Sequence, residues 1–147
     1  MSLTYINEIL PALFSGAGMT LSIFFLTIIL ATPLGIFVSL GEMSKIKPLK
    51  WLVNFYVWIM RGTPLLLQLI FVFYGLPIIH IVFPRYQAAL FAFVLNYAAY
   101  FAEIFRGGFQ SIDEGQFEAA KVLRLTRFQT MTKIIIPQVI KIVLPSI

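Results

Sequence analysis

The sequence predicts an all-α protein, a polytopic transmembrane helical bundle, from its composition and from its long uncharged stretches. Of the 147 residues, 60% are apolar and 12% are charged, about half the charged share of an average soluble domain. No Asp, Glu, Lys or Arg lies between Glu8 and Glu42, or between Arg61 and Arg85. Each stretch exceeds the roughly 20 residues that a helix needs to cross the hydrocarbon layer. The stretch from Arg85 to Glu103 is slightly short, and suffices if Glu103 faces protein or water.

The first predicted span covers about residues 12–40. The N-terminus lacks the basic region of a secretory signal, so we expect this helix to be retained. Residues 41–50 form a short polar connection that contains three lysines. Residues 51–60 are apolar and aromatic but too few to span, and they predict a helix at the membrane interface.

The second and third spans are predicted at residues 64–83 and 87–105. Thr63 is expected to cap the second span, with Pro64 at its first helical position and a bend near residues 75–77. A tight turn at 84–86 separates the two spans, and the Gly107-Gly108 pair is expected to end the third. A fourth apolar segment begins near residue 134 and stops at Ile147, before it could cross a bilayer.

The basic residues predict the orientation. One side of the predicted bundle carries Arg85, and the other carries the connection 41–63 and the segment 106–133. The second side collects Lys45, Lys47, Lys50, Arg61, Arg106, Lys121, Arg124, Arg127 and Lys133. By the positive-inside rule this side is cytoplasmic and the N-terminus is external. The net charge of +5 thus fits a membrane protein, and without aromatic-basic interleaving we expect no nucleic-acid partner.

Several kinds of chemistry are not indicated. The chain has no cysteine and a single histidine, His80. No His/Asp/Glu cluster for a metal and no pairing of a nucleophile with a base is visible, so no catalytic residue, metal or cofactor is expected.

The segment 106–133 is the only long polar stretch. Within it, residues 116–123 predict a short helix with an apolar set at Phe117, Ala120 and Leu123. Glu118 near its start suits the positive end of the helix dipole. The small residues Ala119 and Ala120 would allow another protein to approach closely. The residues alone leave open the alternative of an amphipathic helix that lies on lipid.

Three motifs resemble a known family. Glu118-Ala119-Ala120, position 124 and Ile134-Ile135-Ile136-Pro137 resemble the EAA loop of ABC importer permeases. The stretches MRGTPLLLQ at 60–68 and AYFAEIFRGG at 99–108 resemble the polar amino-acid branch of that family. The resemblance implies one type I ABC importer permease domain over 1–147, with three complete spans and the start of a fourth, in a bacterial cytoplasmic membrane. Family members are longer and have five spans, so we expect most of span four and all of span five to be lacking.

The resemblance also implies partners. In the family two permease subunits form the pathway, two cytoplasmic ATPases drive it, and an external binding protein delivers the substrate. This chain has no G-x-x-x-x-G-K-[ST] loop, so it is not expected to hydrolyse ATP itself. The implied ATPase-coupling residues are Gly115, Glu118, Ala119, Ala120, Leu123 and Arg124.

Arg124 stands where the family has glycine. If that position is a left-handed helix cap, Arg should cost about 1 kcal/mol or more in strain. Otherwise the helix should continue for another turn.

Candidate substrate residues follow from the apolar spans. Glu103 is an ionisable residue within a predicted span, which is by default a functional candidate. Asn96, Tyr100 and Glu103 are spaced i, i+4, i+7 and share one helix face, and Gln68 could join them. The structural alternative is that Glu103 pairs with Arg106 and that Asn96 bonds between helices.

Two other functions remain open. An ion-driven secondary transporter or channel would explain the spans and Glu103 but gives no reason for the 106–133 segment. A non-transporting membrane scaffold would bind partners without moving a solute.

Overall fold

The computed structural model describes the backbone of residues 3–147 and the side chains of residues 9–147, and this part of the chain contains helices but no strand. The predicted all-α class is confirmed. The elements are α1 (Leu3–Glu42), α2 (Lys47–Gly62), α3 (Leu65–Ile70), the π-helix η1 (Phe71–Gly75), the 3₁₀ helix η2 (Leu76–Ile79), α4 (Arg85–Gln110), α5 (Glu114–Val122), α6 (Arg127–Thr130), the π-helix η3 (Met131–Ile135), α7 (Ile136–Val143) and the 3₁₀ helix η4 (Leu144–Ser146).

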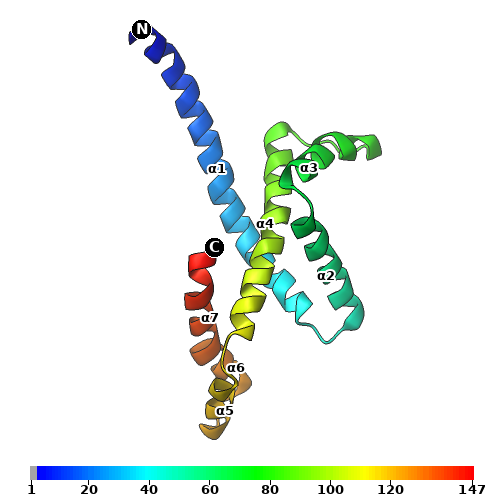
Figure 1. Ribbon diagram of the computed structural model, residues 1–147, viewed down its shortest axis with the longest axis vertical. Helices are drawn as coiled ribbons and strands as arrows, with labels where there is room; N and C mark the ends of the chain where they lie inside the picture. The colour runs from blue at the N-terminus through cyan, green and yellow to red at the C-terminus, as the bar shows by residue number, and fades with distance from the viewer. Residues whose placement is uncertain (1–2) are drawn as a thin grey trace.

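Helix α4 is the central element, and α1, α2, α3 and α7 all pack against it (Figure 1). Small residues permit the close approach: Ala98, Ala99 and Ala102 of α4 are fully buried. A Cβ atom added to Gly35 of α1 would lie 2.7 Å from the Cβ atom of Phe101. Helices α1 and α4 can therefore pack this closely because position 35 is glycine.

Two helices are long and apolar enough to cross a membrane by length and composition: the described part of α1, Ile9–Glu42, and α4. A third crossing exists if α2 and the run 65–79 are counted together, although these two are bent by 107°. The second span is thus not the continuous helix predicted at 64–83. The run 65–79 has 15 residues, too few for a straight crossing.

The bend lies at Thr63 and Pro64, whose backbones are extended, with ψ angles of 144° and 136°. A residue before proline is pushed away from the helical region, which explains why α2 stops there. The expected capping role of Thr63 is wrong. Its hydroxyl donates to the Ile59 carbonyl of the preceding helix at 2.8 Å, and no side chain caps α3. The helical run ends at Ile79, before His80 with a φ of 63°.

The Gly107-Gly108 pair does not end α4, which continues to Gln110. Gly108 is buried and faces Val139 and Val143 of α7, where a Cβ atom would overlap the Val143 side chain. Gly108 thus allows a close helix crossing. Helices α1 and α2 also begin earlier than predicted, at Leu3 and Lys47.

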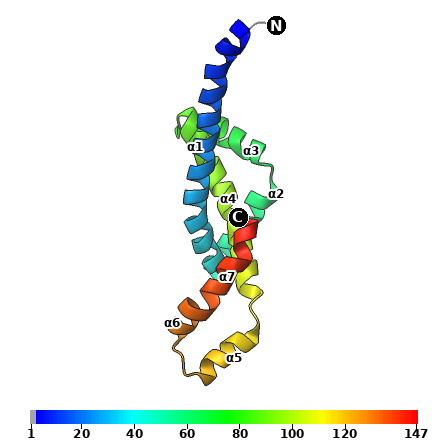
Figure 2. The same ribbon diagram turned by 90° about the vertical axis from the view of Figure 1, so that its left-hand side faces the viewer.

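The segment after α4 leaves the bundle and returns (Figure 2). Helix α5 lies at the end of the molecule opposite the first turns of α1 (Figure 1). Helix α6 begins with a capping box in which Thr126 and Gln129 bond reciprocally. The run from α6 through α7 then packs back on α4, with Ile135, Val139 and Val143 in the main apolar core. Both ends of the α5 segment are therefore anchored to the bundle.

Candidate functional site

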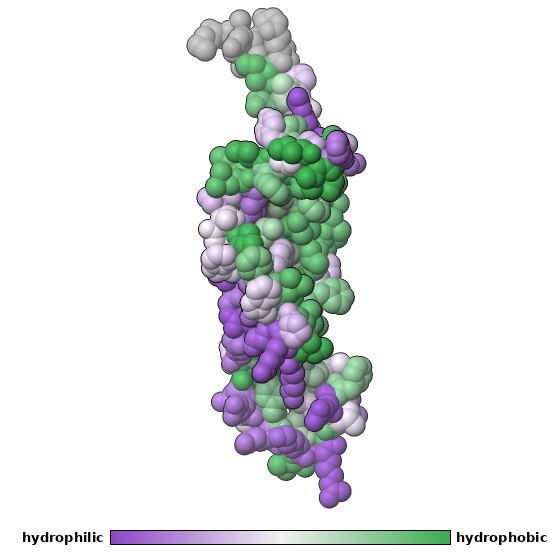
Figure 3. Space-filling view, turned by 90° about the vertical axis from the view of Figure 1, so that its right-hand side faces the viewer, coloured by the Kyte–Doolittle hydropathy of each residue, from purple (hydrophilic) through white to green (hydrophobic). Residues whose placement is uncertain are grey.

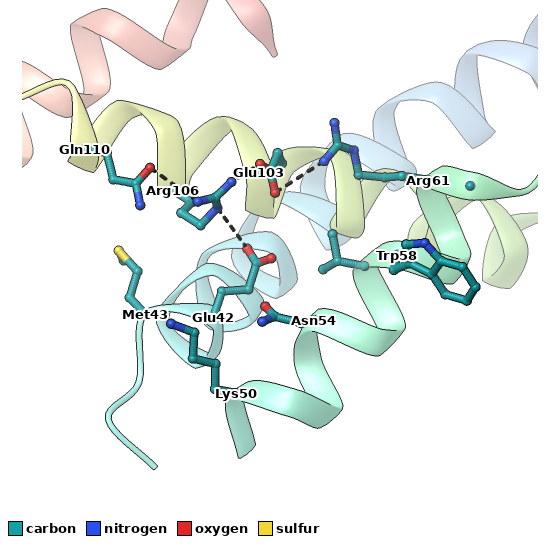
Figure 4. A pocket seen from close by; sticks show the side chains of 11 residues that line it. Glu42, Met43, Lys50, Asn54, Trp58, Arg61, Glu103, Arg106 and Gln110 are labelled. Carbon is teal, nitrogen blue, oxygen red and sulfur yellow. Dashed lines mark hydrogen bonds and ion pairs between the residues drawn. The ribbon is translucent and has the colours of Figure 1, made fainter. Parts of the chain in front are cut away.

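A cluster of four charged side chains lies where α1, α2 and α4 meet (Figure 4). Arg61 Nη1 of α2 lies 3.3 Å from Glu103 Oε2 of α4. Arg106, one turn further along α4, also pairs with Glu103, and its Nε atom lies 3.9 Å from Glu42 Oε2 at the end of α1. We call Glu42, Arg61, Glu103 and Arg106 the charged cluster, and it joins the three helices.

The charged cluster lines a cavity of about 560 Å³. Lys50 and Asn54 of α2 contribute to the same wall, so the lining contains two carboxylates and three cationic groups. The full lining is Glu42, Met43, Lys50, Asn54, Val57, Trp58, Arg61, Gly62, Glu103, Arg106 and Gln110. In the space-filling view of this side of the molecule, hydrophilic residues gather over the lower half, below a mainly apolar part (Figure 3).

Asn96 and Gln68 form a separate polar network. Asn96 Nδ2 donates to the Met60 carbonyl and to Gln68 Oε1, both at 3.0 Å. Gln68 Nε2 donates to the same Met60 carbonyl at 3.0 Å and to Thr63 Oγ1 at 2.8 Å. Asn96 is only 4% exposed, so these bonds satisfy a buried amide. The network ties α4 to the bend between α2 and α3.

The structure thus divides the predicted substrate face in two. Tyr100 joins the charged cluster, since the Arg61 guanidinium carbon lies 5.7 Å from the centroid of its ring. Asn96 and Gln68 bond to each other and to the bend. The alternative expectations for Glu103 and Asn96 also hold, because Glu103 pairs with Arg106 and Asn96 bonds between helices.

Sequence reasoning missed Glu42 and Lys50 as members of a site. Both lie within the predicted connection 41–50, where charged residues are ordinary and give no local signal. Burial distinguishes Glu42 from an ordinary charged residue of a connection. Its side chain is 6% exposed, because the end of α1 packs beside α4. Arg61 entered the prediction as a basic residue that sets orientation and as part of the motif at 60–68, but not as a site residue.

The predicted coupling helix is α5, over Glu114–Val122 rather than 116–123. Asp113 caps its start by accepting a 2.6 Å hydrogen bond from the Gly115 backbone N–H. At its other end the Arg124 N–H donates to the Lys121 carbonyl at 2.9 Å, and the Leu125 N–H to the Ala120 carbonyl at 3.0 Å. This pair of bonds is a Schellman motif.

Arg124 occupies the left-handed position of that motif, with a φ of 55°. The left-handed cap is therefore confirmed, and the alternative of a longer helix is not observed. Glu118, Ala119, Leu123 and Arg124 are exposed at the surface. Ala120 is 1% exposed, so its methyl group packs within the chain and leaves Ala119 as the small residue at the surface.

The comparisons with known proteins agree with this geometry. The family described as "Binding-protein-dependent transport system inner membrane component" matches residues 31–147. The probable amino-acid ABC transporter permease protein YckA of Bacillus subtilis is 44% identical over 95% of this chain and 62% of its own length. The arginine transport system permease protein ArtQ of the same organism is 39% identical over 94% of this chain and 64% of its own length.

A solved structure shows the same arrangement of helices. It is described as a crystal structure of an amino acid ABC transporter with histidines, and it matches with a TM-score of 0.89 and 39% identity. The match covers 99% of this chain and 68% of that one, which confirms the expected type I importer permease fold. This chain spans 62% and 58% of the length of the first two curated relatives.

Proposed function

Because the chain belongs to the family of binding-protein-dependent transport system inner membrane components, we propose that it is the membrane-spanning permease part of an ATP-driven importer of polar amino acids. One observation carries this proposal: α4 carries Glu103 and Arg106 of the charged cluster and is followed, after the short turn at 111–113, by the exposed helix α5. A force applied to α5 would act on the helix that carries Glu103. A secondary transporter or a scaffold has no need of such a connection.

The proposed partners follow from the surfaces. Cytoplasmic ATPase subunits would hold α5 through Glu118, Ala119, Leu123 and Arg124, with Gly115 and Ala120 maintaining the ends of the helix through the capping bonds. ATP hydrolysis would occur in those subunits. The first half of α1 exposes large apolar side chains that require lipid or a second permease subunit. They include Leu13, Phe14, Met19, Leu21, Phe24, Phe25 and Ile29.

The proposed orientation places residues 41–63 and 106–133 in the cytoplasm of a bacterial cell and the N-terminus outside, where a binding protein would deliver the substrate. The basic residues of both segments support it, since the connection between α1 and α2 and the segment after α4 lie toward the same end of the bundle (Figure 1).

We assign substrate contact to Glu103 and Tyr100. A carboxylate beside Arg61 offers both signs of charge, as the ammonium and carboxylate of an amino acid require. Asn96 and Gln68 have amide donors bonded to Met60 and Thr63, so their proposed contribution is to hold the bend beside the site.

The decisive experiment reconstitutes the permease with its ATPase and binding-protein partners in vesicles and measures amino-acid uptake. We expect uptake to require ATP, and the Glu118→Lys variant to lose both uptake and co-purification of the ATPase. Glu114→Lys is the matched control, because Glu114 is exposed on the first turn of the same helix but outside the proposed contact. ATP-independent uptake would favour a secondary transporter, and partner binding without uptake would favour a scaffold.

A further inference from the structure

Helix α2 packs against the rest of the described chain through one side. Val57 on that side is buried against α4. The opposite side of α2 faces outward at the edge of the molecule (Figure 1). Trp51, Phe55 and Trp58 are spaced i, i+4, i+7, so they share one helix face. All three are exposed, which places this face on the outer side of α2.

The three aromatic side chains form a continuous stack. The ring centroids of Trp51 and Phe55 are 5.8 Å apart, and the rings are nearly parallel, at 6°. Phe55 and Trp58 stack in turn at 6.1 Å and 25°. Trp51 and Trp58 are nevertheless 70% and 71% exposed, and Figure 4 shows the Trp58 ring pointing away from Glu42 and Glu103. An aromatic stack that is this exposed calls for a partner outside the chain.

Lysines stand at the start of the same helix. Lys45 precedes α2, and Lys47 is its first residue, one turn before Trp51 on the same face. Both lysines are exposed, and neither has an ion pair among the described residues. No Asp or Glu occurs at positions 43–102, so no carboxylate of α2 offsets their charge. The lysine–aromatic face is defined by Lys45, Lys47, Trp51, Phe55 and Trp58.

The lysines lie where the first span ends. The uncharged stretch of α1 stops at Glu42, and Lys45 follows two residues later in the connection to α2. Because ionisable side chains are costly in hydrocarbon, this point marks the boundary of the membrane. Helix α2 then runs back alongside the bundle (Figure 1), and Trp58 lies about 10 Å beyond Trp51 along its axis. The face therefore extends from head-group level toward the acyl chains, the depth at which lysine and tryptophan are enriched.

We propose that the lysine–aromatic face binds an anionic phospholipid of the surrounding bilayer. Lys45 and Lys47 contact the phosphate and the negatively charged head group, as basic residues beside a membrane span do. The aromatic stack contacts the glycerol region and the upper acyl chains, because its rings are apolar on their faces and the indole N–H groups are polar. This partner goes beyond the proposed transport function, since neither ATP nor a solute takes part in the contact.

Other occupants match the face less well. A second copy of the chain that made a two-fold contact here would bring two further lysines and no carboxylate into the interface. A zwitterionic phospholipid also carries a phosphate, but its own cation would meet the positive charge of Lys45 and Lys47. An anionic phospholipid matches both the charge and the aromatic stack.

Quenching by brominated phospholipids tests the proposal, because Trp51 and Trp58 are the only tryptophans of the chain. The 147-residue protein is reconstituted in nanodiscs of phosphatidylcholine and phosphatidylglycerol in varied ratio, with bromine on the acyl chains of one lipid at a time. Quenching against composition then gives the relative binding of the two lipids at the tryptophans. We expect phosphatidylglycerol to bind about tenfold more tightly at low salt. In about 0.5 M salt, which screens the lysines, this preference should largely disappear.

The Lys45→Gln/Lys47→Gln variant should bind the two lipids about equally, while either brominated lipid still quenches its tryptophans. Lys45→Arg/Lys47→Arg keeps the charge and should keep the preference. Lys121→Gln/Lys133→Gln is the matched control, since it removes the same charge from α5 and η3, outside the face, and it should also keep the preference. If the first variant does not fold, the salt dependence of the unaltered chain decides the matter.

Equal binding of the two lipids to the unaltered chain at low salt would overturn the proposal. A preference that persists in high salt, or that is undiminished in a folded Lys45→Gln/Lys47→Gln protein, would do the same. Absence of quenching by either brominated lipid would also reject it, and would show that a protein surface such as a second copy covers the tryptophans. None of these outcomes bears on ATP-driven uptake, because the nanodiscs contain neither ATPase nor amino acid.

Discussion

At the scale of single residues, conformation and burial decide what the charged and polar side chains do. Arg124 adopts the left-handed conformation that normally favours glycine, because the Schellman motif at the end of α5 imposes it. The positive φ places the strain in the loop that is proposed to contact the ATPase. Asn96, in contrast, is held without strain by its bonds to Met60 and Gln68.

Replacing Arg124 by glycine should stabilise the end of α5 by about 1 kcal/mol, because glycine adopts a positive φ without the Cβ clash. Hydrogen exchange at the Arg124 and Leu125 amides should slow, and ATP-driven uptake should be kept or improved. Arg124→Lys keeps the strain and serves as the control. A large loss of uptake in Arg124→Gly would contradict this prediction and would show that the guanidinium itself is needed.

Removing the Asn96 amide should destabilise the protein by about 1–3 kcal/mol, because Asn96→Ala deletes the bonds of a buried amide and leaves the half-buried Gln68 Oε1 atom without its donor. Thermal unfolding in detergent measures the effect. Asn54→Ala on the exposed side of α2 is the control and should change stability little. Equal stability of the two variants would show that the network does not hold the bend.

At the scale of elements, two close helix crossings around α4 define the bundle. Gly35 allows α1 to approach Phe101, and Gly108 allows α7 to approach α4 near Val143. Glycine thus acts here through its missing side chain, since no glycine among the described residues has a positive φ. The second crossing fixes the return of the chain after α5.

The neighbouring glycines Gly107 and Gly108 give opposite predictions. Gly108→Ala should destabilise the protein by about 1–3 kcal/mol, because the added methyl group overlaps Val143. Gly107 has nothing within 4 Å of an added Cβ, so Gly107→Ala should be neutral or stabilising by up to about 1 kcal/mol through helix propensity. Thermal unfolding of both variants in one detergent checks the pair. A stable Gly108→Ala protein would show that α7 can shift away from α4.

At the scale of the whole molecule, α4 connects the charged cluster to the short turn at 111–113 that precedes α5. Arg61, near the end of α2, pairs with Glu103 of α4. Glu42, at the end of α1, lies beside Arg106 of α4. The ends of α1 and α2 therefore both meet α4 at the Glu103–Arg106 ion pair. A movement of α4 would therefore have to break or re-form ion pairs at Glu103. This connection is the physical basis for the transport proposal.

Neutralising Glu103 should reduce ATP-driven uptake of a cationic amino acid by about tenfold, because Arg61 and Arg106 would lose their shared charged partner and repel the substrate. Assembly with the ATPase should persist in Glu103→Gln, which co-purification measures. Glu114→Gln should transport normally. Unchanged uptake in Glu103→Gln would remove Glu103 from the substrate site.

Uncharged length and motif spacing are local properties of a chain, so they were enough to predict the membrane-spanning all-α class, the first and third spans, and the helix that follows the third. Three features became visible only in the folded chain: the second span is bent by 107° at Thr63 and Pro64, α4 passes through Gly107 and Gly108, and Glu42 is buried beside Arg106. Each of these depends on which helix faces which, and residues such as Gly108 and Val143, distant in the chain, meet only once the helices pack. In the sequence the pair Gly107-Gly108 suggests the end of a helix, whereas in the folded chain α4 continues and Val143 of α7 packs against Gly108.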